Sequence, residues 1–427
     1  MYAREIYGMM MAGMMLLIAG CSTDDVVNET TSAQGIAISF SCNYDNEEEN
    51  ETRAADQDAT GITRTGQQGA MNTEDLYATG FGVMASVTAG NAAPYDNKPN
   101  LMYNQEVKYT FVGDMGLSNP ADPKSDTLRG YWSYSPLKYW PTSLEHCYIS
   151  AYAPYVEPAY LNSLTPEQLA KETGIIGISE NYEAPYITYR RCEKPDKMVD
   201  LLWYYKNFAP TDKIPEATAT KPAGTLNMKM HHALARLEIK VALKEGTVLA
   251  EGTKVLIDSI TLTGTMTRTA KLILNDETVV EGKHYPKWQA LNPADTENRT
   301  IIIDNEDNNS ESYGIIDAQV RYIEGLPYSW QPAGLKVYNP SAPEGTDDGM
   351  RNALSTGDRV GYIYLIPQDE LELTVEVKYH QMTSGSDKKT TTSSTVHIPP
   401  KPSEEAPYPP LKGNTTYTLK LTLKEIL

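Results

Sequence analysis

The sequence predicts an all-β protein built from β-sandwiches. Apolar and polar residues alternate in several segments, turn-forming Gly, Pro and Asn separate these segments, and helical periodicity is scarce. One short helix is expected at Thr165–Lys171, because Pro166 suits a first helical turn. The chain has 29 Tyr and 4 Phe, and Tyr suits strands whose rings pack while their hydroxyls stay in water.

The alternating segments run along the whole chain. The first strand has four apolar residues at a spacing of two, which are Ile36, Ile38, Phe40 and Cys42. A second segment runs from Leu226 to Leu243 and changes phase near Ala235-Arg236, which predicts a β-bulge there. A third runs from Leu371 to Tyr379. The last strand again has four apolar residues at a spacing of two, which are Tyr417, Leu419, Leu421 and Leu423.

The chain length predicts two domains after the N-terminal segment. A chain of 427 residues is long enough for two domains that each bury a core. Three prolines between residues 209 and 224 suggest an interdomain linker. We therefore expect four parts: a signal peptide, a lipid tether with the first strand as a candidate pro-segment, an N-terminal β-sandwich domain and a C-terminal one, at residues 1–20, 21–53, 54–215 and 216–427.

The N-terminus predicts secretion and lipid anchoring. The apolar stretch Gly8–Gly20 is too short to span a bilayer and fits the core of a signal peptide. Small residues directly before Cys21 resemble a bacterial lipobox, which implies cleavage before Cys21 and acylation of its thiol. Asp24 and Asp25 resemble the surface-export signal of Bacteroidetes lipoproteins. The alternatives are a signal peptide with a chance Cys, and acids that only keep the tether soluble.

Charge and cysteine content exclude several classes. A net charge of −19 argues against nucleic-acid binding, which needs Lys and Arg to contact phosphates. Three further cysteines, Cys42, Cys147 and Cys192, allow one disulfide at most and match no zinc spacing, so we expect buried thiols.

No catalytic or cofactor motif is convincing. The chain has no HExxH, GxSxG or phosphate-loop sequence, so we expect no enzyme, no catalytic residue, no metal and no cofactor. The Gly80–Ala85 run fits a strand better than a dinucleotide fingerprint. His231 and His232 lie in an alternating strand, so one ring is expected to face inward and one outward. A core histidine is favoured over the alternative of a metal ligand.

An aromatic motif at Tyr131–Pro141 has two interpretations. Flat aromatic faces stack on sugars, so Trp132, Tyr134 and Trp140 could form a glycan platform. The favoured alternative is a pair of aromatic strands that pack in the core of a sandwich.

Taken together, the motifs resemble the fimbrillin family, the type V pilin-like lipoproteins of Bacteroidales. The resemblance covers nearly the whole chain and rests on the order and spacing of its pieces. These are the lipobox, Ile36–Phe40 followed by Thr52-Arg53-Ala54, Leu101–Asn104, Lys138–Pro141, Asp200–Leu202, His232–Leu237, Tyr364–Gln368 and Lys412–Leu419. The family implies two tandem transthyretin-like β-sandwich domains and assembly into adhesive fimbriae on the outer membrane.

The resemblance also implies an assembly mechanism. An arginine-specific protease cuts after the first strand, here at Arg53 or Arg64, and that strand leaves. The C-terminal strand of another subunit then fills the groove, since an open sheet edge accepts an extended strand. The expected partners are therefore other fimbrial subunits, the outer membrane and, for adhesion, host or bacterial surface ligands. The alternative is an uncut surface lipoprotein that acts as a pilus anchor, an accessory subunit or a glycan-binding module.

Overall fold

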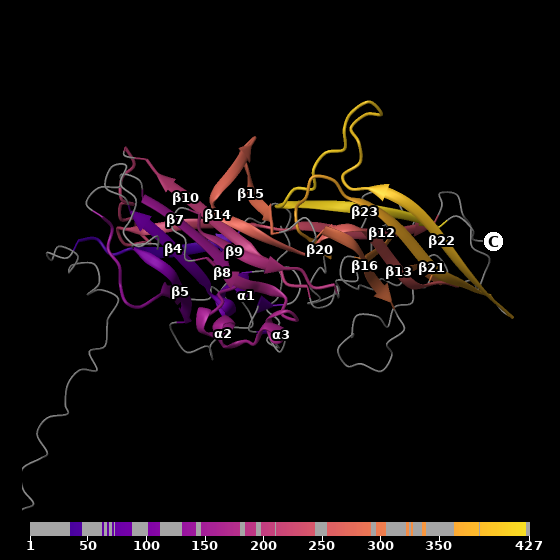
Figure 1. Ribbon diagram of the computed structural model, residues 1–427, viewed down its shortest axis with the longest axis horizontal. Coiled ribbons are helices and arrows are strands. Elements are labelled where there is room, and N and C mark those ends of the chain that lie inside the picture. The colour runs from indigo at the N-terminus through magenta and orange to yellow at the C-terminus, as the bar shows by residue number, and fades with distance from the viewer. Residues whose placement is uncertain are drawn as a thin grey trace, which may run out of the picture.

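The computed structural model is mostly β, with several sheets and few short helices (Figure 1). Strands dominate the residues that the structure describes, as the alternating sequence pattern predicted. The structure describes residues 35–44, 62–63, 66–67, 71, 73–87, 101–111, 130–141, 147–179, 184–193, 198–209, 211–243, 254–291, 296–304, 322–323, 326–327, 335–338, 363–383 and 385–423.

A seven-stranded sheet forms most of the N-terminal half. Its strands, in spatial order, are β1 (Ser39–Tyr44), β11 (Thr225–His232), β10 (Leu202–Phe208), β7 (Cys147–Ala153), β4 (Phe81–Val87), β5 (Met102–Phe111) and β6 (Gly130–Ser133). β1 and β6 are its two edges. β4 confirms that the Gly80–Ala85 run belongs to a strand. A buried cluster that includes Phe81, Val107 and Leu202 packs on this sheet.

A second sheet joins the two halves of the chain. Its four strands, in spatial order, are β15 (Lys283–Ala290), β14 (Thr269–Val280), β9 (Tyr186–Arg190) and β8 (Gly174–Ile178). β14 and β9 pair antiparallel although they are far apart in sequence.

The C-terminal half contains two further four-stranded sheets. The first has the order β16 (Thr296–Asp304), β13 (Lys254–Thr267), β21 (Glu372–Thr383) and β22 (Ser386–His397). In the second, β12 pairs with three strands, and the members are β12 (Ala235–Leu243), β19 (Leu335–Tyr338), β20 (Ile363–Leu365) and β23 (Thr415–Leu423).

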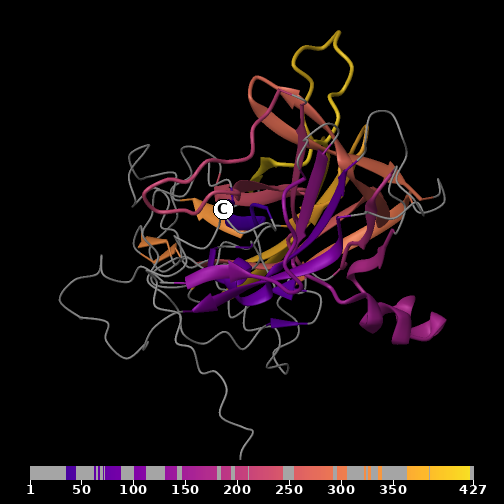
Figure 2. The ribbon, with the colours of Figure 1, turned by 90° about the vertical axis from the view of Figure 1, so that its left-hand side faces the viewer.

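The remaining elements are short. Two small hairpins are formed by β2 (Ile62–Thr63) with β3 (Gly66–Gln67) and by β17 (Tyr322–Ile323) with β18 (Leu326–Pro327). The helices are α1 (Thr73–Thr79), α2 (Pro158–Ser163) and α3 (Pro166–Leu169), and Figure 2 shows α2 and α3, in magenta, to one side of the sheets. Among the described residues, no helix is both long and apolar enough to cross a bilayer.

The predicted helix near Thr165 is confirmed as α3, although it is shorter than expected. The Thr165 side chain accepts a hydrogen bond from the Gln168 backbone, and the Gln168 side chain accepts one from the Thr165 backbone. This reciprocal pairing satisfies two backbone donors at the start of the helix. Pro166, at the first helical position, has no backbone N–H that needs a partner.

The phase change between Leu226 and Leu243 has a different cause from the one expected. β12 pairs with β23 over its whole length without a shift of register, so there is no bulge at Ala235-Arg236. Instead, the chain bends at Ala233-Leu234 and passes from the seven-stranded sheet to the sheet of β12. Each strand keeps its own alternation, and the change of sheet accounts for the change of phase.

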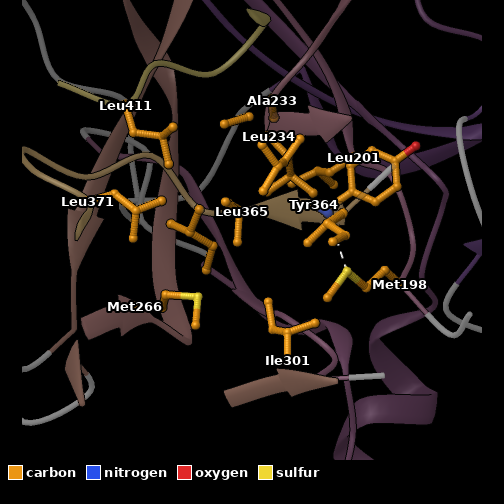
Figure 3. Packing of buried hydrophobic residues seen from close by; sticks show 14 of the residues in the cluster. Met198, Leu201, Ala233, Leu234, Met266, Ile301, Tyr364, Leu365, Leu371 and Leu411 are labelled. Atoms are coloured by element: carbon orange, nitrogen blue, oxygen red, sulfur yellow. Dashed lines mark hydrogen bonds between the residues drawn. The ribbon is translucent and has the colours of Figure 1, made fainter. Parts of the chain in front are cut away.

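Strands from both sides of the predicted domain boundary at residues 215 and 216 share sheets. β11 lies beyond that boundary yet pairs with β1 and β10, and β14 pairs with β9. A continuous core crosses the same region (Figure 3), where the Tyr364 backbone N–H donates to the sulfur of Met198 over 3.3 Å. The division into domains stays a prediction, and any hinge there would have to break these contacts.

Candidate functional site

β1 fills one edge of the seven-stranded sheet. It runs parallel to β11, with Phe40 opposite Leu226 and Cys42 opposite Met228. Ile38, Phe40 and Cys42 are buried, and Ile36 packs against the same cluster. On the face of the sheet opposite Phe40, the hydroxyl groups of Ser39 and Thr225 hydrogen-bond over 2.8 Å. The strand therefore closes a slot whose inner wall is the core of this half.

Aromatic rings surround Phe40 inside this slot. Its ring lies edge-on to Phe81, with centroids 5.8 Å apart, and is tilted against Tyr134 at 5.5 Å. Such edge-on and tilted pairs contribute beyond the apolar area that they bury. Burial raises the pKa of the Cys42 thiol far above its ordinary value and that of the Cys147 thiol in β7 to about 12. Both thiols therefore stay protonated and act as core residues.

β23 occupies a comparable place in the other half. It runs parallel to β12, with Leu419 opposite Ile239. Leu419, Leu421 and Leu423 are buried in the second core cluster, and Tyr417 is half-buried against it. The Tyr417 hydroxyl oxygen accepts a hydrogen bond from the Lys412 backbone N–H over 2.9 Å. In Figure 1, β23, drawn in yellow, lies beside β12.

The two strands share one chain segment as their neighbour. β11 and β12 are consecutive, separated only by Ala233-Leu234, and each has a parallel strand beside it, β1 in one case and β23 in the other. The sequence predicted the apolar residues of both strands, but it contained no signal for this shared, parallel arrangement.

The aromatic motif lies mostly in the core. Trp132 and Trp140 are 8% and 5% exposed, and each packs edge-on against another ring, Phe81 in the first case and Phe208 in the second. The faces of these two indoles are covered by protein and do not form an open glycan platform. This agrees with the favoured interpretation of aromatic packing in the core. Tyr131, which is 56% exposed, is the open ring of the motif.

Both histidines of the His231-His232 pair are buried, so the expectation of one outward ring is wrong. The His232 ring shares a 2.7 Å hydrogen bond with the Asp200 carboxylate. His231 is covered from outside by the hairpin of β14 and β15, where its ring stacks on His284 at 4.5 Å. Among the described residues, no group of His, Cys, Asp and Glu could hold a metal ion.

Asp200 has a structural role that the sequence did not predict. Its buried carboxylate accepts hydrogen bonds from the backbone N–H groups of Met71 and Leu201, over 3.2 and 2.8 Å, as well as sharing the one with His232. Asp200 thereby fixes Met71, which follows both candidate cleavage arginines in the sequence, to the centre of the molecule. The only sequence signal was its place in the Asp200–Leu202 motif.

Three predicted sites cannot be placed. The lipidation residue Cys21 and the cleavage residues Arg53 and Arg64 lie outside the described residues. Among the described residues, Cys42, Cys147 and Cys192 form no disulfide bond with one another. The first two are buried as expected, and Cys192 is only partly covered.

Comparisons with known proteins found similarity in structure only. No protein-family model matches the chain, and no curated protein matches it. A fimbrial protein from Bacteroides vulgatus aligns with a TM-score of 0.46 and 18% identity, over 91% of this chain and 95% of that one. A candidate cell adhesion protein from Parabacteroides distasonis aligns with a TM-score of 0.35 and 10% identity, over 91% and 87%. One from Bacteroides eggerthii gives 0.31 and 8%, over 92% and 88%. These scores are too low to transfer the roles of those proteins to this chain.

Proposed function

We propose that this protein is a structural subunit of cell-surface fimbriae that function in adhesion. It would consist of two tandem transthyretin-like β-sandwich domains and be held in the outer membrane through Cys21 until it is processed. After cleavage at Arg53 or Arg64, β1 leaves, and β23 of another copy takes its place. The observation that supports this most is that β1 and β23 present alternating apolar residues and run parallel to consecutive strands, β11 and β12.

The slot of β1 suits an incoming strand. If β1 leaves, β11 presents unpaired backbone groups along one edge, and such an edge accepts an extended chain. Placing the four apolar residues of β23 in the slot would contribute on the order of 6–12 kcal/mol before entropic costs, at roughly 1.5–3 kcal/mol for each side chain. Backbone hydrogen bonds would add about 0.5–1.5 kcal/mol each and would mainly fix the register.

Strand exchange needs cleavage because β23 buries similar apolar side chains in its own sheet and in the slot of β1. β23 already buries Leu419, Leu421 and Leu423 in its own sheet, so the free energy of exchange is a difference between two comparable burials. While β1 is covalently attached, its effective concentration at the slot is far above that of any other strand. A cut at Arg53 or Arg64 removes this advantage and lets another copy compete.

A peptide experiment tests the slot without altering the body. The protein is cut with an arginine-specific protease and mixed with a synthetic peptide of residues 413–427, and native mass spectrometry follows the N-terminal fragment. We expect the fragment to be lost as the peptide binds. The matched control is the same peptide with Leu421→Asp, which places a charge against the apolar wall and should not bind. Equal binding of both peptides would contradict a C-terminal donor.

The peptide is preferable to a variant of the whole chain. Leu421 is buried in its own sheet, so Leu421→Asp in the full protein would also destabilise the C-terminal half. On cells, the mature N-terminus separates the two roles. Ala54 or Thr65 as the first residue supports a processed pilin, whereas acylated Cys21 on all molecules would favour an uncut anchor or accessory subunit.

A further inference from the structure

The segment Tyr134–Trp140 crosses the start of β1 and is called the strap below. The Ile38 backbone N–H donates to the Lys138 carbonyl over 2.8 Å, and the Trp140 backbone N–H donates to the Ile36 carbonyl over 2.9 Å. These bonds flank an antiparallel bridge between Ala37 and Tyr139. On the other side, the Ser39 backbone N–H donates to the Gly224 carbonyl at the start of β11, over 3.2 Å. The beginning of β1 is therefore held from both sides.

The Tyr134 hydroxyl closes a ring of hydrogen bonds around Ile38. It donates to the Ile38 carbonyl over 2.8 Å, and its oxygen accepts from the Lys138 backbone N–H over 3.2 Å. The Ile38 N–H in turn donates to the Lys138 carbonyl. Both backbone groups of Ile38 are thus bound through the strap. Burial raises the pKa of Tyr134, so this hydroxyl keeps its proton and stays a donor at neutral pH.

The strap is fastened to the far wall of the slot. The indole N–H of Trp140 donates to the Gly224 carbonyl over 2.9 Å, which is the same carbonyl that the Ser39 N–H reaches. Its ring is buried edge-on to Phe208, with centroids 5.2 Å apart. The strap therefore spans the slot from one wall to the other.

Each of the hydrogen bonds that hold the start of β1 is made with a backbone group of residues 36–39. A backbone clamp does not depend on the side chains of the strand that it holds. We propose that the strap is a gate for strand exchange, which must open before β1 leaves and then closes on the backbone of the strand of a second copy that replaces it. This inference rests on the proposed exchange of strands, but its opening step can be measured in the uncut protein.

Tyr134→Phe is the variant that tests the gate, and Tyr131→Phe is its matched control. Tyr134→Phe keeps the ring that contacts Phe40 and removes only the hydroxyl, whereas Tyr131 lies exposed in the same motif. In uncut protein, we expect hydrogen–deuterium exchange of a peptide covering residues 35–44 to be about two- to tenfold faster in Tyr134→Phe, the range for one net hydrogen bond. Tyr131→Phe should match the wild type.

Release of the N-terminal fragment after cleavage gives the second readout. We expect Tyr134→Phe and Trp140→Phe, which lacks the indole N–H, to release it about two- to tenfold faster than the wild type. If Tyr134→Phe changes neither the deuterium exchange nor the release, the gate is refuted. If its deuterium exchange is faster but no variant releases the fragment or takes up a new strand, the strap does hold β1 and the proposed function fails.

Discussion

β1 and β23 are both edge strands with buried, alternating apolar residues, but they are held in different ways. β23 pairs with β12 along nine residues and has no other strand neighbour among the described strands. β1 pairs with β11 along only six residues and is bonded on its other side near Ile36 and Ile38. The short strand thus depends on contacts at one end, and the long one on its length. Under the proposed strand exchange, opening this one end would release β1.

The largest expected effect comes from removing the central ring of β1. Phe40→Ala should lower the free energy of unfolding by about 3–5 kcal/mol, because it leaves a cavity between Phe81 and Tyr134. Leu421→Ala, its counterpart in β23, should cost about 2–5 kcal/mol. Urea denaturation measures both.

The two alanine variants should differ most in where the chain opens. Phe40→Ala should raise deuterium exchange in residues 35–44 far more than in residues 415–423, and Leu421→Ala should do the opposite. Equal changes in both strands would mean that β1 and β23 belong to one cooperative unit and do not open separately.

Local sequence patterns predicted what each strand buries, but not where it lies. Alternation alone identified Ile38, Phe40, Leu419 and Leu421 as inward residues, since period two follows from strand geometry. The strap was not predicted, because the Tyr134–Ile38 bond joins residues that are 96 positions apart. The expectation of one outward ring in the His231-His232 pair failed for the same reason, because the cover of His231 comes from a hairpin far along the chain.

Gly224 and Gly413 allow a second comparison of the two strand sites. Gly224 directly precedes β11, which pairs with β1, and Gly413 lies just before β23. A Cβ on Gly224 would lie 2.3 Å from the Ala37 carbonyl, and Gly224 has a φ of +83°. A Cβ on Gly413 would lie 2.3 Å from the Ala233 carbonyl, with no such backbone strain. Gly224→Ala should therefore cost about 2–5 kcal/mol and Gly413→Ala about 1–3 kcal/mol. Thermal unfolding and hydrogen–deuterium exchange of each strand measure these losses of stability. A larger effect at Gly413 than at Gly224 would contradict the prediction.

Cys42 can report whether β1 is in its slot. In a Cys21→Ser background at pH 7–8, a maleimide should modify Cys42 and Cys147 at least about tenfold more slowly than the partly exposed Cys192. After cleavage and release, Cys42 should react rapidly, whereas Cys147 in β7 should stay protected.

The same two thiols predict a pH dependence. Burial raises both pKa values above the ordinary 9.0, so the folded protein keeps these protons where the unfolded chain loses them. Their contribution to stability should be complete below pH 9 and decline as the pH rises above it. A Cys42→Ala, Cys147→Ala variant should show a smaller decline in urea denaturation at pH 10, and an equal decline would refute this assignment.

The smallest effect is expected for Tyr417→Phe. This variant distinguishes the role of the Tyr417 hydroxyl from that of the Tyr134 hydroxyl. The Tyr417 hydroxyl accepts from the Lys412 N–H, five residues earlier in the same segment, so under the proposed exchange this bond would stay with β23. The Tyr134 hydroxyl instead bonds across to β1. Tyr417→Phe should lower the free energy of unfolding by about 0.5–1.5 kcal/mol, the net value of one hydrogen bond. The same substitution in a peptide of residues 411–427, which includes Lys412, should leave its affinity for the vacated slot within about threefold, since this segment loses the bond free and bound alike. A loss of affinity well beyond that would mean that the Tyr417 hydroxyl contacts the slot directly. The Tyr417 bond would then help to hold the strand in place, as the Tyr134 bond does, and the two hydroxyls would not differ in role.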